Sequence, residues 1–148
     1  MIAVIQRSKS ADVSIEGEIA GRIDYGLVIL LGVCRGDEET DADYLAAKVS
    51  GMRIFSDNQG KMNLSINEVS GSALVISQFT LCGDWRKGRR PSFINAAPPE
   101  EGERLYKYFI NCLKKNGLPV QSGIFGAMMD VHLINDGPVT FVLDSKLK

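Results

Sequence analysis

The chain has 148 residues, with 17 Lys and Arg against 18 Asp and Glu and a net charge of −1. This length suits one domain with a buried core, which we predict to span residues 1–148. The balanced charge excludes a basic surface over the whole protein, so any contact with nucleic acid must come from a local patch.

Three cysteines, Cys34, Cys82 and Cys112, lie far apart without C-x-x-C spacing. They favour reduced thiols in a cytosolic protein over a disulfide framework. The longest apolar run, 26–34, is about half of the roughly 20 residues that a membrane helix requires. Residues 1–7 are too short for a signal-peptide core, so we expect a soluble cytoplasmic protein that contacts no membrane.

The first third of the chain is predicted to form strands. Residues 2–8 read as a first strand, and the alternation of Val13 and Ile15 with polar neighbours indicates a hairpin that turns at Glu16 and Gly17. Residues 27–31 are apolar without alternation, which is typical of a central strand covered on both faces.

Two segments have helical spacing. Residues 37–52 predict a first helix, with Thr40 and Asp43 as a capping box, although Asp37 is an equally good start. Residues 100–116 predict a second helix that stops at Asn116-Gly117.

Three further strands complete the prediction: 73–79, and two alternating strands on either side of a turn at residues 135–138. The expected fold class is α+β, with mostly antiparallel strands and two main helices packed outside the sheet.

Few side chains are available for acid–base chemistry. His132 is the only histidine, and its place on an alternating strand favours a solvent-facing residue over a member of a catalytic triad. One histidine and three scattered cysteines predict no metal site, and the chain has neither a G-x-G-x-x-G loop nor a P-loop. We therefore expect no metal and no cofactor.

The segment 77–81 offers several kinds of chemistry. Thr80 is a candidate nucleophile but would need a base, and its neighbours include only Ser77 and Gln78. Ser77 and Thr80 could instead cap a strand end. The option we favour is an oxyanion hole made by the backbone N–H groups of Phe79 and Thr80, because it needs no basic side chain. Cys82 is a second candidate nucleophile, but a buried structural thiol is the favoured interpretation.

A basic run of four cations, Arg86, Lys87, Arg89 and Arg90, follows this segment. Such runs are usually solvated loops. Directly after a catalytic strand, however, the run is well placed to contact a phosphate backbone, which is the interpretation that we favour.

Several motifs resemble those of the D-aminoacyl-tRNA deacylases over essentially the whole chain. The two main signatures are Ser77-Gln78-Phe79-Thr80-Leu81 and Asn135-Asp136-Gly137-Pro138-Val139-Thr140. The flanking matches are Val4-Ile5-Gln6-Arg7, Gly88-Arg89-Arg90-Pro91-Ser92-Phe93 and Gly123-Ile124-Phe125-Gly126-Ala127-Met128-Met129. No single motif is specific, but all of them in this order form a strong signal.

The resemblance implies a curved, barrel-like sheet and a homodimer with active sites near the subunit interface. It implies hydrolysis of D-aminoacyl-tRNA, and of glycyl-tRNA, at a site formed by Ser77, Gln78, Phe79 and Thr80. The partner is then tRNA rather than DNA, and catalysis is RNA-assisted and metal-independent.

The resemblance also implies further site residues. Gly137 and Pro138 are expected to form a cis pair that rejects L-aminoacyl groups in the partner subunit's site, held in place by Arg7. Phe125 and Met129 are expected to bind the terminal adenosine. Two rival hypotheses stay open, a cysteine hydrolase that uses Cys82 and a non-catalytic RNA-binding module that uses residues 86–90.

Overall fold

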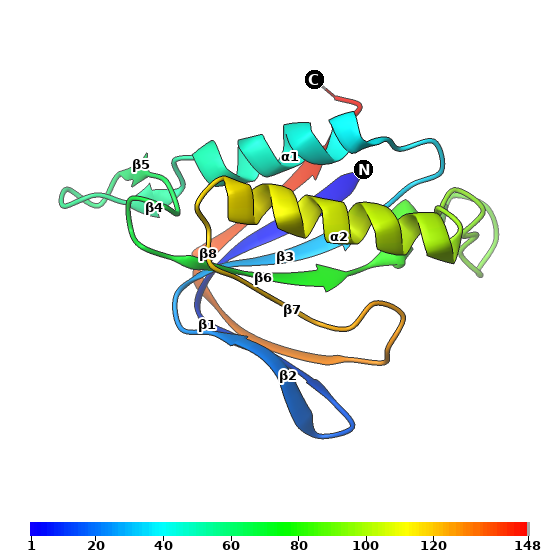
Figure 1. Cartoon of the computed structure of the whole chain (residues 1–148), viewed down its shortest axis with the longest axis horizontal. Coiled ribbons are helices and arrows are strands. Elements are labelled where there is room, and N and C mark those ends of the chain that lie inside the picture. Colours follow the sequence, from blue (N-terminus) through cyan, green and yellow to red (C-terminus); the bar gives the residue numbers. More distant parts are fainter. Residues whose placement is uncertain (148) are drawn as a thin grey trace.

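The structure is a computed structural model, and it describes residues 1–147. A curved six-stranded sheet carries two helices side by side over one face (Figure 1). The elements in chain order are β1 (Ile2–Ile15), β2 (Glu18–Ile23), β3 (Gly26–Gly32), α1 (Glu39–Gly51), β4 (Phe55–Ser56), β5 (Met62–Leu64), β6 (Ser72–Ser77), the 3-10 turn η1 (Phe79–Cys82), α2 (Pro99–Lys115), β7 (Val120–Ser122) and β8 (Asp130–Asp144). The predicted α+β class with two outer helices is confirmed.

The sheet is mixed. Strand β1 pairs antiparallel with β2, β3 and β8, whereas the β3–β6 and β6–β7 pairs are parallel. Most of the pairing is antiparallel, as predicted. The two parallel pairs were not predicted, and they arise because α1 and α2 act as crossovers that return the chain in the same direction.

The sheet is nearly closed into a barrel. Its path runs β2-β1-β3-β6-β7, and the two end strands approach each other closely. A Cβ at Gly21 of β2 would lie 2.9 Å from the carbonyl oxygen of Ser122 in β7. Only glycine lets the two backbones come this near.

Two strands are longer than predicted. β1 is continuous from residue 2 to residue 15, and it forms the predicted hairpin with β2. β8 is also continuous, so the turn predicted at residues 135–138 is wrong. The β1–β8 register shifts between Gln6 and Ser8 and again between Ser8 and Ser10, so an irregularity inside the strand accommodates the Gly-Pro pair.

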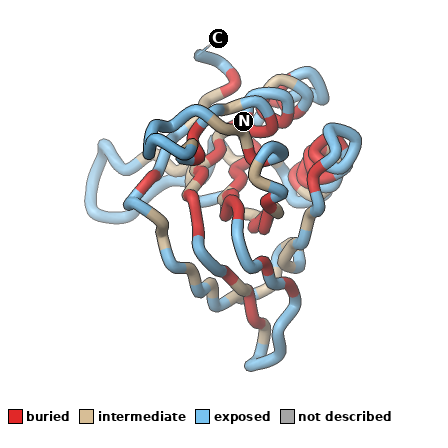
Figure 2. Tube along the Cα trace, turned by 90° about the vertical axis from the view of Figure 1, so that its left-hand side faces the viewer, coloured by how far each residue is buried: buried red, intermediate tan, exposed pale blue. Residues whose placement is uncertain are grey.

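Two apolar clusters bury the central strands on both faces, as the unbroken apolar run of β3 predicted. In β6, Ala73 and Val75 belong to the cluster under the helices, and Leu74 and Ile76 to the one on the opposite side. Figure 2 shows buried residues where the helices face the sheet. The pale blue loop at the bottom of Figure 2 is the exposed end of the β1–β2 hairpin.

The first helix begins with a capping box two residues earlier than the predicted one. Glu38 and Asp41 form it, and the Glu38 N–H donates to the Asp41 carboxylate at 2.9 Å. Thr40 and Asp43 therefore do not cap the helix. Asp37 is not the cap either, because its buried carboxylate accepts a hydrogen bond from the Met1 ammonium at 2.6 Å. The short strands β4, β5 and β7 were not predicted from sequence.

Candidate active site

The first signature segment, residues 77–81, begins at the last residue of β6, where the parallel pairing of β6 with β3 ends. The Gln78 N–H donates to the carbonyl of Leu31 at 2.8 Å, which extends the β3–β6 pairing by one bond. The chain then tightens into η1, closed by a bond of 3.2 Å from the Leu81 N–H to the Gln78 carbonyl. Phe79 and Thr80 are therefore the first residues of a turn that stands at the end of the sheet.

Two backbone donors remain available in this turn. The first N–H groups of a helical turn have no acceptor within it. Among residues 1–147, no protein group accepts a hydrogen bond from the N–H of Phe79 or of Thr80. Both residues are exposed, so the turn that carries the two donors lies at the surface.

The side chains near the turn provide no general base. The Thr80 hydroxyl accepts a hydrogen bond from the Gln78 amide, and an amide cannot take up a proton at neutral pH. Ser77 is half-buried at the end of β6. The geometry thus favours the main-chain option over a threonine nucleophile.

Neither alternative nucleophilic arrangement is formed. Cys82 is 5% exposed, as expected for a buried thiol, and the hydrogen bond with Cys34 together with burial raises the pKa of its thiol. His132 is solvent-facing, as predicted, with a 72% exposed side chain whose Nδ1 lies 3.4 Å from a carboxylate oxygen of Asp12.

The basic run lies on a loop that begins beside the turn. Asp84 and Ser92 exchange backbone hydrogen bonds of 2.8 and 2.9 Å that close the loop. Arg86 is held by two bonds of 2.8 Å to the Asp84 carboxylate, which lowers the pKa of Asp84 to about 2. In the described part of the chain, Lys87, Arg89 and Arg90 have no carboxylate partner, and all are exposed.

Aromatic and thioether groups surround the same end of the sheet. The rings of Phe79 and Phe93 meet edge to face with centroids 5.1 Å apart. Phe125 packs on α2, 5.8 Å from the ring of Tyr106. Met129 is half-buried against the cluster that contains Ile76, one residue before Ser77. Met129 therefore lies near the first signature, whereas Phe125 approaches β6 through Tyr106, whose hydroxyl donates to the Val75 carbonyl at 2.8 Å. The contact of Phe93 with Phe79 was not predicted.

The second signature lies on β8 and is held by Arg7. The Gly137–Pro138 peptide bond is cis, and both residues are exposed. The buried Arg7 guanidinium donates to the Asp136 carbonyl at 2.9 Å and to the Ile54 carbonyl at 2.8 Å. Gly137 has φ +140°, and an added Cβ would lie 2.6 Å from Cγ2 of Val139, so no other residue fits there.

Asn135 fixes the other side of this segment, a role that was not predicted. Its Oδ1 accepts a hydrogen bond from the Val139 N–H at 2.7 Å, and its Nδ2 donates to the Thr140 hydroxyl at 2.9 Å. Asparagine side chains often bond to nearby backbone in this way, so its place before Asp-Gly-Pro was an available signal.

The two signature segments lie apart within one chain. Ser77 pairs with Leu31 and thereby aligns with Ala3, whereas Gly137 lies beside Arg7. The offset from Ala3 to Arg7 corresponds to roughly 13 Å along the strands, and β6 and β8 are about three strand spacings apart. One chain therefore does not bring the turn and the Gly-Pro pair into a single site.

The outer edge of β8 is free of strand partners. Within residues 1–147, β8 pairs only with β1. Ile134 is 57% exposed and Val142 70% exposed on this strand. A long edge strand with exposed apolar side chains is a surface suited to pairing with another chain.

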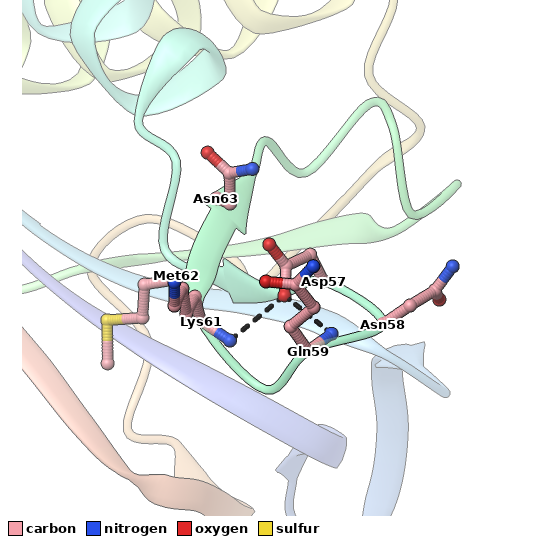
Figure 3. Close-up of a pocket in the computed structure, with 6 residues that line it drawn as sticks. All are labelled: Asp57, Asn58, Gln59, Lys61, Met62 and Asn63. Atoms are coloured by element: carbon pink, nitrogen blue, oxygen red, sulfur yellow. Dashed lines mark hydrogen bonds between the residues drawn. The ribbon is translucent and has the colours of Figure 1, made fainter.

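The hollow between β4 and β5 is a poor candidate for catalysis. It is lined by Asp57, Asn58, Gln59, Lys61, Met62 and Asn63 (Figure 3). The Asp57 carboxylate accepts the N–H groups of Gln59 and Lys61 at 2.8 and 3.0 Å, so it serves its own turn. Figure 1 places this hairpin and the basic loop at opposite ends of the molecule.

No three His, Cys, Asp or Glu side chains within residues 1–147 gather as a metal site. In the same part of the chain, no helix is long and apolar enough to cross a bilayer.

Comparison with solved structures supports the fold. The structure titled "c-Myc DNA Unwinding Element Binding Protein" matches with a TM-score of 0.91 and 37% identity, over 97% of this chain and 98% of its own. A second, titled "Structural Analysis of a probable eukaryotic D-amino acid tRNA deacylase", matches with a TM-score of 0.79 over 96% and 97%. At 17% identity, the second match supports the fold alone.

Comparison of sequences identifies the family. The family model described as D-Tyr-tRNA(Tyr) deacylase matches residues 4–144. A Geobacter metallireducens protein named D-aminoacyl-tRNA deacylase is 57% identical over 145 residues, or 98% of this chain and 96% of its own. A Bacillus cytotoxicus protein of the same name is 56% identical over 146 residues, or 99% and 100%. The chain therefore belongs to the D-aminoacyl-tRNA deacylases, a family of hydrolases.

Proposed function

We propose that the protein hydrolyses the ester of D-aminoacyl-tRNA and of glycyl-tRNA, and that it rejects L-aminoacyl-tRNA. The observation that carries this proposal is that η1 offers two unpaired backbone N–H donors on an exposed turn whose side chains include no base. Such a turn is suited to stabilising charge on an ester that another group activates.

The substrate supplies the missing group in this mechanism. The terminal ribose of aminoacyl-tRNA carries a hydroxyl next to the ester, which positions or activates water. As the tetrahedral intermediate forms, the N–H groups of Phe79 and Thr80 donate to its oxyanion, while Ser77 and Gln78 shape the site around them. The reaction then needs no metal and no cofactor.

The surroundings of the turn fit the end of a tRNA. The half-buried Phe125 and Met129 form an apolar wall for the terminal adenine. Lys87, Arg89 and Arg90 contact phosphates, because their charges are exposed and unpaired within the described chain. Arg86 contributes less, because the Asp84 carboxylate already neutralises it.

Chirality is read by main chain in a homodimer. Gly137 and Pro138 lie on the free edge of β8, far from the turn of their own chain, so they enter the site of a partner subunit. Their backbone obstructs the position of an L side chain whatever its chemistry. Arg7 and Asn135 hold this backbone in place through the hydrogen bonds described above.

Residues 1–148 then act as one catalytic domain on charged tRNA in the cytoplasm. The test is a panel of D-alanyl-, L-alanyl- and glycyl-tRNA incubated with purified protein in excess EDTA. We expect the D and glycyl substrates to be hydrolysed and the L substrate to survive.

Each contrary result would overturn a different part of the proposed function. Equal turnover of D- and L-alanyl-tRNA would overturn the filter. Survival of glycyl-tRNA would indicate recognition of the D side chain itself. No turnover of any substrate would overturn the deacylase function, and activity that is lost in EDTA would overturn the metal-free mechanism.

A further inference from the structure

Two cysteines from different parts of the chain meet beside the catalytic turn. Cys34 follows β3 and Cys82 ends η1, and their sulfur atoms lie 2.8 Å apart although 48 positions separate them in sequence. Cys34 is half-buried and more accessible than Cys82, which is 5% exposed. Neither thiol takes part in the mechanism proposed above.

We propose that Cys34 and Cys82 are a redox-sensitive site that closes reversibly to a disulfide when a hydroperoxide oxidises it, and that closure slows the adjoining active site. Only the effect on turnover rests on the deacylase function. The formation of the disulfide stands on the geometry of the two thiols.

The two thiols are suited to different steps of the oxidation. The hydrogen bond between them lowers the pKa of Cys34, which makes the more exposed sulfur the better thiolate. The same bond and burial raise the pKa of Cys82, which stays a protonated thiol. Cys34 is then the attacking sulfur and Cys82 the resolving one.

The hydroperoxide is the two-electron oxidant for this reaction. The Cys34 thiolate attacks one oxygen of hydrogen peroxide, the O–O bond breaks, and a sulfenic acid and hydroxide form. The Cys82 thiol then attacks the sulfenic sulfur and displaces hydroxide, which leaves as water with the thiol proton. Overall, two thiols and one peroxide give one disulfide and two waters, and a dithiol reductant reverses the change.

Closure acts on the turn directly. A disulfide needs its sulfur atoms about 2.05 Å apart, so closure draws the two together by under about 1 Å. Cys82 is the last residue of η1, which carries the Phe79 and Thr80 donors. A misplacement of about 1 Å can slow catalysis about a hundredfold, so the smaller shift here is expected to slow turnover about tenfold.

The experiment treats purified full-length protein with hydrogen peroxide, quenches it, and labels it with N-ethylmaleimide under denaturing conditions. Intact mass then counts the free thiols, and peptide mapping identifies the linked pair. We expect three labels on the reduced chain and one, at Cys112, after oxidation. Deacylation of D-alanyl-tRNA is expected to fall about tenfold and to recover with dithiothreitol.

Two variants separate this pair from general oxidation. Cys112→Ser is the matched control, because Cys112 lies on α2, away from the other two thiols. This variant should still form the disulfide and lose turnover after peroxide. Cys34→Ser should lose both the disulfide and the peroxide sensitivity.

Three results would overturn the proposal: three labels after peroxide, oxidised protein with unchanged turnover, or a peroxide-sensitive Cys34→Ser enzyme. If the reduced protein hydrolyses no aminoacyl-tRNA, the deacylase function and the effect on turnover both fail. The label count then still decides whether the disulfide forms.

Discussion

Replacing Arg7 with alanine should loosen the Gly-Pro segment and destabilise the fold together. The Arg7 side chain is 8% exposed and lies 3.2 Å from a carboxylate oxygen of Asp136. It also donates to the carbonyls of Asp136 and Ile54. Alanine removes these interactions at once and leaves the two carbonyls without their donor.

The magnitude follows from the unpaired groups. A buried polar group left without its partner costs about 1–3 kcal/mol, so two carbonyls cost about 4 kcal/mol in total. For a domain of this size, each kcal/mol lowers the Tm by about 2–4 °C, so the Tm of Arg7→Ala should fall by about 10 °C. The Tm of Arg7→Lys should lie between those of the unchanged protein and Arg7→Ala, because an ammonium group cannot reproduce the hydrogen bonds of the planar guanidinium.

The assay combines thermal and urea unfolding with hydrolysis of D- and L-alanyl-tRNA. The matched control is Arg22→Ala, whose side chain is 60% exposed and 4.0 Å from the Asp12 carboxylate. An exposed ion pair of this kind is worth at most about 1 kcal/mol. Arg7→Ala should therefore lose stability and the exclusion of the L substrate, while the control keeps both. An Arg7→Ala protein as stable and as selective as the control would refute this reasoning.

Three further predictions concern catalysis, docking and acid stability. Thr80→Ala and Cys82→Ala should each keep substantial activity, and a loss above about a thousandfold in folded Thr80→Ala would restore the side-chain mechanism. Neutralising Arg89 and Arg90 should weaken tRNA binding and flatten its dependence on salt, whereas an unchanged slope would return the loop to a solvated surface. Burial raises the pKa of Asp41, but hydrogen bonds outweigh it and lower the pKa from 3.8 to about 2. Asp41→Asn should thus cost about 2 kcal/mol above pH 4, by urea unfolding, and the difference should shrink as the pH falls towards 2; a pH-independent difference would contradict this.

The pattern of apolar residues along the sequence correctly predicted those strands and helices in which the pattern follows directly from burial. Strand β3 is covered on both faces, and α2 buries one stripe of apolar side chains, so both stand out in the sequence. The continuity of β8 was hidden, because Asn-Asp-Gly-Pro has the composition of a turn. Proline is tolerated there because a free strand edge needs no N–H from it.

Contacts between distant parts of the chain were not predictable from local patterns. The parallel β3–β6 pair depends on which strand lies beside which after a helical crossover, and the pattern of a single strand does not record this. The site residues came from the family resemblance rather than from spacing. The approach of Cys34 to Cys82 has no local signal, because 48 positions separate the two thiols.

The most direct test of the account compares two D-tyrosyl-tRNA substrates that differ only in the hydroxyl next to the ester on the terminal ribose. The central claim is that the protein contributes backbone donors while the substrate contributes the activating group. Single-turnover hydrolysis by the reduced protein should be fast with the hydroxyl and nearly absent without it. Equal rates for the two substrates would contradict the account and would require an activating side chain in the protein.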